Sequence, residues 1–185
     1  MKQLFEFANN STDGKFLIPI ILGSYGLRRS ELCALEPSDF TDDSVYIKRS
    51  MVMDVDKNWI VKDYPKNSTS IRRLPIDKEV IAMIKEQGYV YKGHPNSISD
   101  FIAKYCKQYN VPHFSLHKLR HYFCSRLISE NVDIKTTISM SGHKTDAVLK
   151  RIYLHSIDEK VKEASERLDS ILFGDGPKWS SASKE

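Results

Sequence analysis

The chain has 185 residues and a formal net charge of +4, with 41% hydrophobic and 28% charged residues, which is typical of one globular domain and permits an anionic partner. Two large domains are excluded by this length, and a membrane span is excluded because the longest apolar stretch, Phe16–Leu22, falls far short of roughly 20 residues. The three cysteines are too far apart for a disulfide framework or a cysteine zinc site, so we expect reduced core cysteines in a cytoplasmic protein.

The sequence of the first part of the chain predicts short helices followed by strands. Helices are expected at Lys2–Asn10 and Lys15–Tyr25, and a short one at Glu31–Leu35 follows the turn at residues 26–30. Three later segments alternate apolar and polar residues, around Val45–Ile47, Trp59–Val61 and Leu74–Ile76. We expect these segments to form one small antiparallel sheet of about three strands.

The remainder of the chain predicts helices only. Four of these helices begin at a residue that can cap them, namely Asp77, Ser97, Ser115 and Asp133. Two more are expected at Thr145–Tyr153 and Ser156–Leu172. The predicted fold class is therefore α+β and mostly helical, with one domain over residues 1–173. Residues 174–185 are small and polar, and we expect a disordered tail there.

The helix that begins at Ser115 places an arginine at the edge of its apolar face. On a helical wheel, four apolar residues fall within one arc and should face the core, namely Leu116, Leu119, Phe123 and Leu127. Arg120 lies at the border of that arc, and His117 lies about 60° beyond it. A guanidinium at the border of a core is costly unless an anion satisfies it. Either an internal carboxylate or a bound phosphate would serve, and the carboxylate is the simpler interpretation of this helix alone.

Two further features have ordinary structural interpretations when each is considered alone. Gly142 followed by His143 is typical of a glycine that ends a helix and a histidine on the surface. Tyr153 lies near Leu149 and Ile152 and would suit the edge of a core. Their order and spacing relative to Arg120 are more informative than either feature by itself.

Four sequence elements occur in order along the chain. Gly26–Leu35 reads Gly-Leu-Arg-Arg-Ser-Glu-Leu-Cys-Ala-Leu, and Lys66–Ile76 reads Lys-Asn-Ser-Thr-Ser-Ile-Arg-Arg-Leu-Pro-Ile. His117–His121 reads His-Lys-Leu-Arg-His, and Gly142-His143 is followed by Tyr153. Together they resemble the phage integrase family, the tyrosine recombinases, whose upstream motifs are Gly-Leu-Arg-x-x-Glu-Leu-x-x-Leu and Lys-Thr-x-x-Ser-x-Arg-x-Val-Pro-Leu.

Two positions depart from the family pattern. Asn67 stands where threonine is usual, and Ser141 stands where leucine is usual. Neither replaces a residue that performs chemistry, so the departures concern local packing.

The resemblance implies a fold, a partner and an activity. The fold would be that of the tyrosine recombinase catalytic domain, a DNA breaking and rejoining enzyme, and the partner would be double-stranded DNA in integration or excision. Family members usually carry an N-terminal helical domain that clamps the DNA, and we expect that domain to be absent here. The source would be bacterial or phage-encoded, and the location cytoplasmic. No cofactor or metal is needed for this activity. His113 lies before the helix that carries His117 and His121, and no third metal ligand is evident on the face of those two histidines.

The same resemblance implies the roles of the residues that match the motifs. Tyr153 would attack a backbone phosphate, forming a 3′-phosphotyrosyl link and leaving a free 5′-hydroxyl. Arg28 and Arg120 suit the task of holding the non-bridging oxygens, since they are fixed charged donors, and His143 would add a third donor.

Three other residues are candidates for proton transfer and for holding Arg28 in position. Lys66 is the candidate general acid for the leaving 5′-oxygen, because an ammonium beside two arginines gives up its proton more readily. His117 is the candidate acceptor of the tyrosine proton, or the group that orients the tyrosine. Glu31 follows Arg28 by one helical turn and could hold it in position, and a surface ion pair of little value is an equally open interpretation.

The last predicted helix carries a narrow apolar seam, formed by Ile157, Val161, Ala164, Leu168 and Ile171. The seam would pack on the chain's own core or, as in the family, dock on a neighbouring protomer of a DNA-bound tetramer. Without the DNA-clamping domain, we expect a monomer in solution. Two other functions remain compatible with the motifs. One is a DNA-binding or accessory module of the same fold without cleavage activity, and the other is a type IB topoisomerase-like nicking and closing enzyme.

Overall fold

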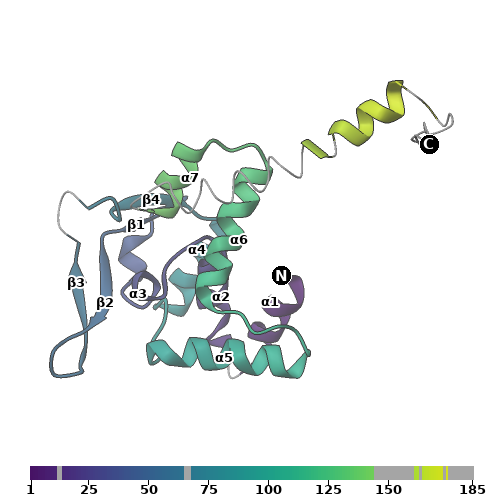
Figure 1. Cartoon of the computed structure of the whole chain (residues 1–185). Helices are drawn as coiled ribbons and strands as arrows, with labels where there is room; N and C mark the ends of the chain where they lie inside the picture. The colour runs from purple at the N-terminus through teal and green to yellow at the C-terminus, as the bar shows by residue number, and fades with distance from the viewer. Residues whose placement is uncertain (12–13, 65–67, 144–160, 163, 173, 175–185) are drawn as a thin grey trace.

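The computed structural model describes residues 1–11, 14–64, 68–143, 161–162, 164–172 and 174. It is mostly helical with two small antiparallel strand pairs, so the predicted α+β fold class is confirmed (Figure 1). Within those ranges, no helix has both the length and the apolar character that crossing a membrane would require.

Three N-terminal helices lead up to and past Arg28. α1 (Lys2–Asn9) and α2 (Leu17–Ser24) lie within two residues of their predicted bounds. α3 (Arg29–Leu32) begins earlier than predicted and is shorter. Its start is set by a capping box, in which the carboxylate of Glu31 accepts the backbone N–H of Arg28 at 2.9 Å. A 3₁₀ turn, η2 (Pro37–Asp39), follows.

The strands form two pairs instead of one sheet of about three strands. β1 (Ser44–Ile47) pairs with β4 (Arg72–Pro75), and β2 (Arg49–Met53) pairs with β3 (Trp59–Asp63), all antiparallel. Figure 1 shows β2 and β3 as a hairpin that extends away from the helices. β2 was not predicted, because Ser50 is its single buried residue and apolar and polar residues do not alternate there.

Four further helices carry or flank the predicted site. They are α4 (Lys78–Gln87), α5 (Pro95–Gln108), α6 (Leu116–Ser129) and α7 (Ile134–Ser141). Asp77 and Asp133 cap α4 and α7 through their side chains, as predicted. α5 begins before the predicted Ser97, because Pro95 occupies its first position and the His94 ring accepts the N–H of Asn96. The predicted helix 145–153 lies outside the described residues, and residues 161–162 and 164–172 of the last helix are helical.

Close packing of α2 against α6 joins the two halves of the chain. A Cβ atom on Gly23 of α2 would lie only 2.5 Å from Cδ1 of Leu116, so glycine is needed for this approach. The buried face of α6 is rotated from the predicted arc: Cys124 and Ile128 are buried, whereas Phe123 and Leu127 are only partly buried. The rotation takes Arg120 from the edge of the apolar face into the interior. Cys33, Cys106 and Cys124 are free and buried, as expected.

Candidate active site

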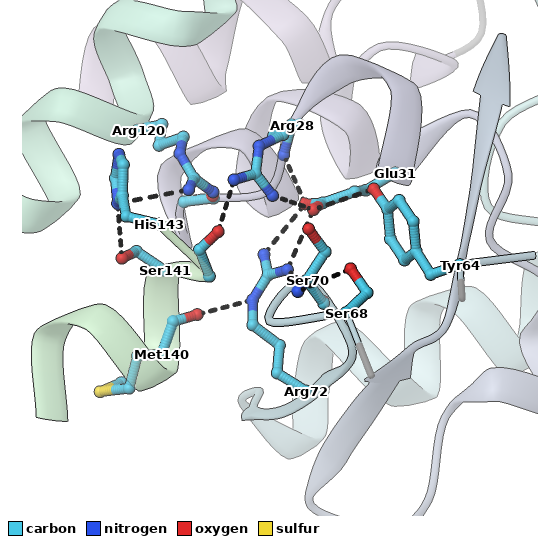
Figure 2. A network of polar contacts seen from close by, with 12 residues as sticks. Arg28, Glu31, Tyr64, Ser68, Ser70, Arg72, Arg120, Met140, Ser141 and His143 are labelled. Carbon is cyan, nitrogen blue, oxygen red and sulfur yellow. Dashed lines mark hydrogen bonds and ion pairs between the residues drawn. The ribbon is translucent and has the colours of Figure 1, made fainter. Parts of the chain in front are cut away.

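Arg28 and Arg120 are each held by a glycine carbonyl that belongs to a distant motif. Nη2 of Arg28 donates to the carbonyl oxygen of Gly142 at 2.5 Å, and Nη1 of Arg120 donates to that of Gly26 at 2.6 Å (Figure 2). Both glycines have left-handed backbone conformations, with φ of 69° and 86°. The glycines of the matched motifs therefore position the arginines, because each carbonyl binds the guanidinium of the other motif.

The neighbouring side chains also leave no room for a Cβ atom at Gly142 or Gly26. A Cβ atom on Gly142 would lie 2.8 Å from Nη1 of Arg72, and one on Gly26 would lie 2.6 Å from Cδ1 of Phe123. A larger residue would be strained at these φ values and would displace the arginine network or the α6 packing.

Glu31 is fully buried and bridges two arginines. Its Oε1 and Oε2 atoms accept from Nη1 and Nη2 of Arg72 at 3.0 and 2.9 Å, and Oε1 also accepts from Nη1 of Arg28 at 2.5 Å. Burial by itself would raise the pKa of Glu31, but the hydrogen bonds and charge of Arg72, with the charge of Arg28, lower it below its usual value. The contact is therefore a buried ionised network and not a surface ion pair.

Arg72 also belongs to this network, although it was not among the predicted site residues. It lies at the start of β4, its side chain is only 4% exposed, and its Nε donates to the carbonyl oxygen of Met140 at 2.8 Å (Figure 2). The signal was present, since the hairpin motif quoted above contains an arginine at this position. What the motif did not reveal was its partner, because Glu31 belongs to another motif.

His143 lies beside Arg120 at the end of α7. Its Nδ1 atom is 2.8 Å from Oγ of Ser141 and 3.4 Å from Nη2 of Arg120. Partial burial, followed by the charges of Arg120 and Arg28, lowers the pKa of His143 to about 4. The imidazole is therefore neutral at neutral pH in the free protein. It is half-buried within a cationic cluster, in contrast to the surface histidine that Gly142-His143 alone would suggest.

His117 lies at the more exposed edge of the site. Its ring meets that of His121 edge to face, with centroids 4.6 Å apart, and burial followed by the charges of His121 and Arg120 lowers its pKa. A pocket of about 340 Å³ is lined by Arg28, Arg29, Ser30, Ser99, Ser115, Leu116 and His117. His117 and Arg28 thus face the same open space.

The electrostatic balance of the site is strongly positive. Among the described residues, Glu31 is the single carboxylate bonded to the guanidinium groups of Arg28, Arg72 or Arg120. Arg120 is 1% exposed, and its Nε has no hydrogen-bond partner within the described ranges. Burial, with the charge of Arg28, lowers the pKa of Arg120 to about 10. A buried guanidinium with an unused donor and no carboxylate of its own is suited to an anion.

Two of the predicted residues cannot be placed in this geometry. Lys66 and Tyr153 lie outside the described residues, although Tyr64 and Ser68 on either side of the Lys66 segment are described. Within the described ranges, no group of three or more His, Cys, Asp or Glu side chains is arranged to hold a metal ion. The structure thus brings together Arg28, Glu31, Arg120 and His143, with His117 at the edge.

Comparison with known proteins assigns the family. The sequence profile of the phage integrase family matches residues 1–160, which is most of the chain. The chain belongs to the phage integrase family. This family relationship accounts for the order of the four motifs from Gly26 to Tyr153.

Relatives of this integrase family member are distant and longer. A tyrosine recombinase XerC-like protein of Caldanaerobacter subterraneus is 26% identical over 183 residues, covering 80% of this chain and 47% of the relative. The ICEBs1 integrase of Bacillus subtilis is 27% identical over 176 residues, covering 80% of this chain and 46% of the relative. The chain spans about half the length of these curated relatives.

Solved integrase structures confirm the catalytic-domain fold. The Tn1549 transposon integrase, in complex with circular intermediate DNA, gives a TM-score of 0.72 at 21% identity and covers 90% of this chain and 64% of that chain. The catalytic domain of the bacteriophage HP1 integrase gives a TM-score of 0.57 at 20% identity, covering 87% and 89%. The second match covers nearly all of an isolated catalytic domain.

Proposed function

We propose that residues 1–173 are the catalytic domain of a site-specific DNA recombinase that breaks and rejoins double-stranded DNA. Membership of the phage integrase family supports this proposal, as do relatives named tyrosine recombinase, integrase and transposase from a transposon. The observation that carries it is the convergence of Arg28, Arg120 and His143 around a site with a positive charge excess. A DNA phosphodiester is the anion that fits these donors.

The proposed chemistry uses the site as a phosphoryl-transfer centre. The phenol oxygen of Tyr153 bonds to phosphorus while the bond from phosphorus to the 5′-oxygen breaks. The phenol proton passes to His117, and Lys66 supplies a proton to the leaving 5′-oxygen. Rejoining reverses these steps when the 5′-hydroxyl of a partner strand attacks the 3′-phosphotyrosyl link.

The arginines contribute most as the transition state forms. Negative charge builds up on the non-bridging oxygens of the pentavalent phosphorus, where the guanidiniums of Arg28 and Arg120 would bind. Both are pre-positioned by glycine carbonyls and Glu31, so little reorganisation is needed when the charge develops. His143 would add a donor on the same side.

A nicked DNA substrate tests this function. Cleavage close to the nick releases a short fragment, so rejoining fails and the covalent complex accumulates as a gel-stable adduct. The adduct is expected with this chain, and its absence would favour an accessory DNA-binding module. Two-site substrates then separate the enzyme classes, because a recombinase exchanges strands whereas a topoisomerase-like enzyme only relaxes supercoils.

The pH dependence of DNA binding is expected to report on His143. The charged and titratable groups around it are Arg120, Arg28, His121 and His117, and a phosphate would offset their positive charge. Binding should therefore raise the pKa of His143 from about 4 and take up a proton, so affinity should increase as pH falls from about 8 to about 5.5.

Fluorescence anisotropy at constant ionic strength would measure this slope. His143→Asn should remove most of it, whereas His121→Asn should retain it. An unchanged slope in His143→Asn would show that the proton is taken up elsewhere.

We further propose that the last helix docks on a second copy of this chain on DNA. Val161, Leu168 and Ile171 are 61%, 53% and 79% exposed, so these described residues of the seam are not packed on the core of the chain. Figure 1 shows this helix away from the rest of the chain.

Leu168→Asp should eliminate assemblies of several protomers on two-site DNA, as measured by sedimentation, while the binding of single protomers is retained. Val55→Asp, at a 97% exposed residue, is the matched control; equal assembly by both variants would refute the docking.

A further inference from the structure

We propose that Arg72 is a positioning residue for the cleavage step: it holds in register the segment that carries Arg28, the segment that carries His143, and the described residues on either side of Lys66. This inference rests on the proposed function and goes beyond it by assigning a role to an arginine whose hydrogen bonds within the described residues go to protein acceptors. Its basis is the set of contacts that Arg72 makes with all three segments.

The first connection runs to Arg28 through Glu31. Arg72 binds both carboxylate oxygens of Glu31 in a side-by-side pair, at 3.0 and 2.9 Å. The same carboxylate accepts from the backbone N–H and from Nη1 of Arg28. Without Arg72, the buried carboxylate of Glu31 would keep Arg28 as its single cationic partner among the described residues. The two hydrogen bonds that orient this carboxylate toward Arg28 would be lost.

The second connection runs to the end of α7, which precedes His143. Nε of Arg72 donates to the carbonyl oxygen of Met140 at 2.8 Å, which is one of the carbonyls that the end of a helix leaves unpaired. The guanidinium also lies against the backbone of Gly142, where a Cβ atom would be 3.1 Å from its Cζ. Arg72 therefore fixes the turn whose carbonyl binds Arg28 and whose next residue is His143.

The third connection runs to both sides of the segment that contains Lys66. On one side, Nη1 of Arg72 donates to the carbonyl oxygen of Ser70 at 3.0 Å. On the other side, the hydroxyl of Tyr64 donates to Oε1 of Glu31 at 3.4 Å (Figure 2). The described residues that flank Lys66 are thus attached to the Arg72–Glu31 pair.

Arginine suits these contacts because the protein itself supplies the acceptors for its donor atoms. Four hydrogen bonds from its Nε, Nη1 and Nη2 atoms go to protein acceptors, and the side chain is 4% exposed. Lysine could not reproduce the planar fork that serves a carboxylate and two carbonyls at once. Arg72 therefore acts through the residues it holds and not on the phosphate.

Single-turnover cleavage of nicked DNA by Arg72→Lys tests the proposal. The rate constant for adduct formation at saturating DNA is expected to fall about 30- to 100-fold, while Kd changes no more than about 3-fold. Loss of folded protein would lower the amplitude and not the rate constant, so misfolding is separated from misplacement. Wild-type protein must form the adduct in the same assay; if it does not, the proposed function fails instead.

Arg49→Lys is the matched control. Arg49 is also a largely buried arginine on a strand, and it bonds to Asp39, Glu36 and the carbonyl of Ala34. These hydrogen bonds and ion pairs go to none of the proposed site residues, so the rate constant of Arg49→Lys should remain near wild type. An equal rate loss in Arg49→Lys would mean that Arg72 acts through general stability, and the proposal would fail.

A double variant tests the route through Glu31. Glu31→Gln should slow cleavage by a similar factor, and Glu31→Gln combined with Arg72→Lys should be little slower than the slower single variant. Multiplicative losses would show that the two residues act independently. A wild-type rate constant in Arg72→Lys would overturn the inference outright.

Discussion

Tyr153→Phe is expected to abolish the covalent protein–DNA adduct completely while leaving DNA affinity within about 2-fold of wild type. The phenol oxygen is the atom that would bond to phosphorus, and phenylalanine removes that oxygen with almost no change in volume. Incubation with a nicked substrate, followed by a denaturing gel, measures the adduct directly. Anisotropy on the intact duplex measures binding.

Tyr122→Phe provides the control for this experiment. Tyr122 lies on α6 and is 49% exposed, so loss of its hydroxyl should leave both adduct and binding unchanged. A gel-stable adduct from Tyr153→Phe would refute the nucleophile assignment. Peptide mapping of that adduct would then identify the residue that carries the DNA.

Arg120→Met is expected to slow adduct formation by about 10³-fold. Arg120 is buried, it has no carboxylate partner among the described residues, and its Nε is unused, so its charge is available for the phosphate as charge develops. Methionine fills a similar volume without that charge. Single-turnover rates at saturating DNA are the measurement.

Arg120→Met should change the free energy of unfolding much less than it changes the free-energy barrier to adduct formation. Removing Arg120 relieves a desolvated charge, although it also leaves the carbonyl of Gly26 without its donor, so the two effects oppose each other. Lys118→Met, at an exposed position of the same helix, removes the same formal charge and should cleave within about 3-fold of wild type. If both variants lost activity equally, net charge and not the guanidinium would account for the effect.

Local signals in the sequence were sufficient for most helices. Asp77, Asp133 and Gly142 mark helix ends because a cap is formed by residues within one turn of each other. β2 and the start of α5 were missed because Ser50 breaks the alternation and His94 is an unusual cap. The pairing of β1 with β4 and of β2 with β3 also depends on which distant segments meet after folding, and a local sequence pattern carries no such information.

Four motifs in order along the chain were enough to identify the family and the residue types of the site. How those residues support one another could be seen only in the folded chain. The bonds from Arg28 to Gly142 and from Arg120 to Gly26 join residues 114 and 94 positions apart, and Arg72 reaches Glu31 across 41. Such contacts depend on burial and on the direction of each side chain after the chain has folded, so the Arg72–Glu31 pair and the unpaired charge of Arg120 became visible only in three dimensions.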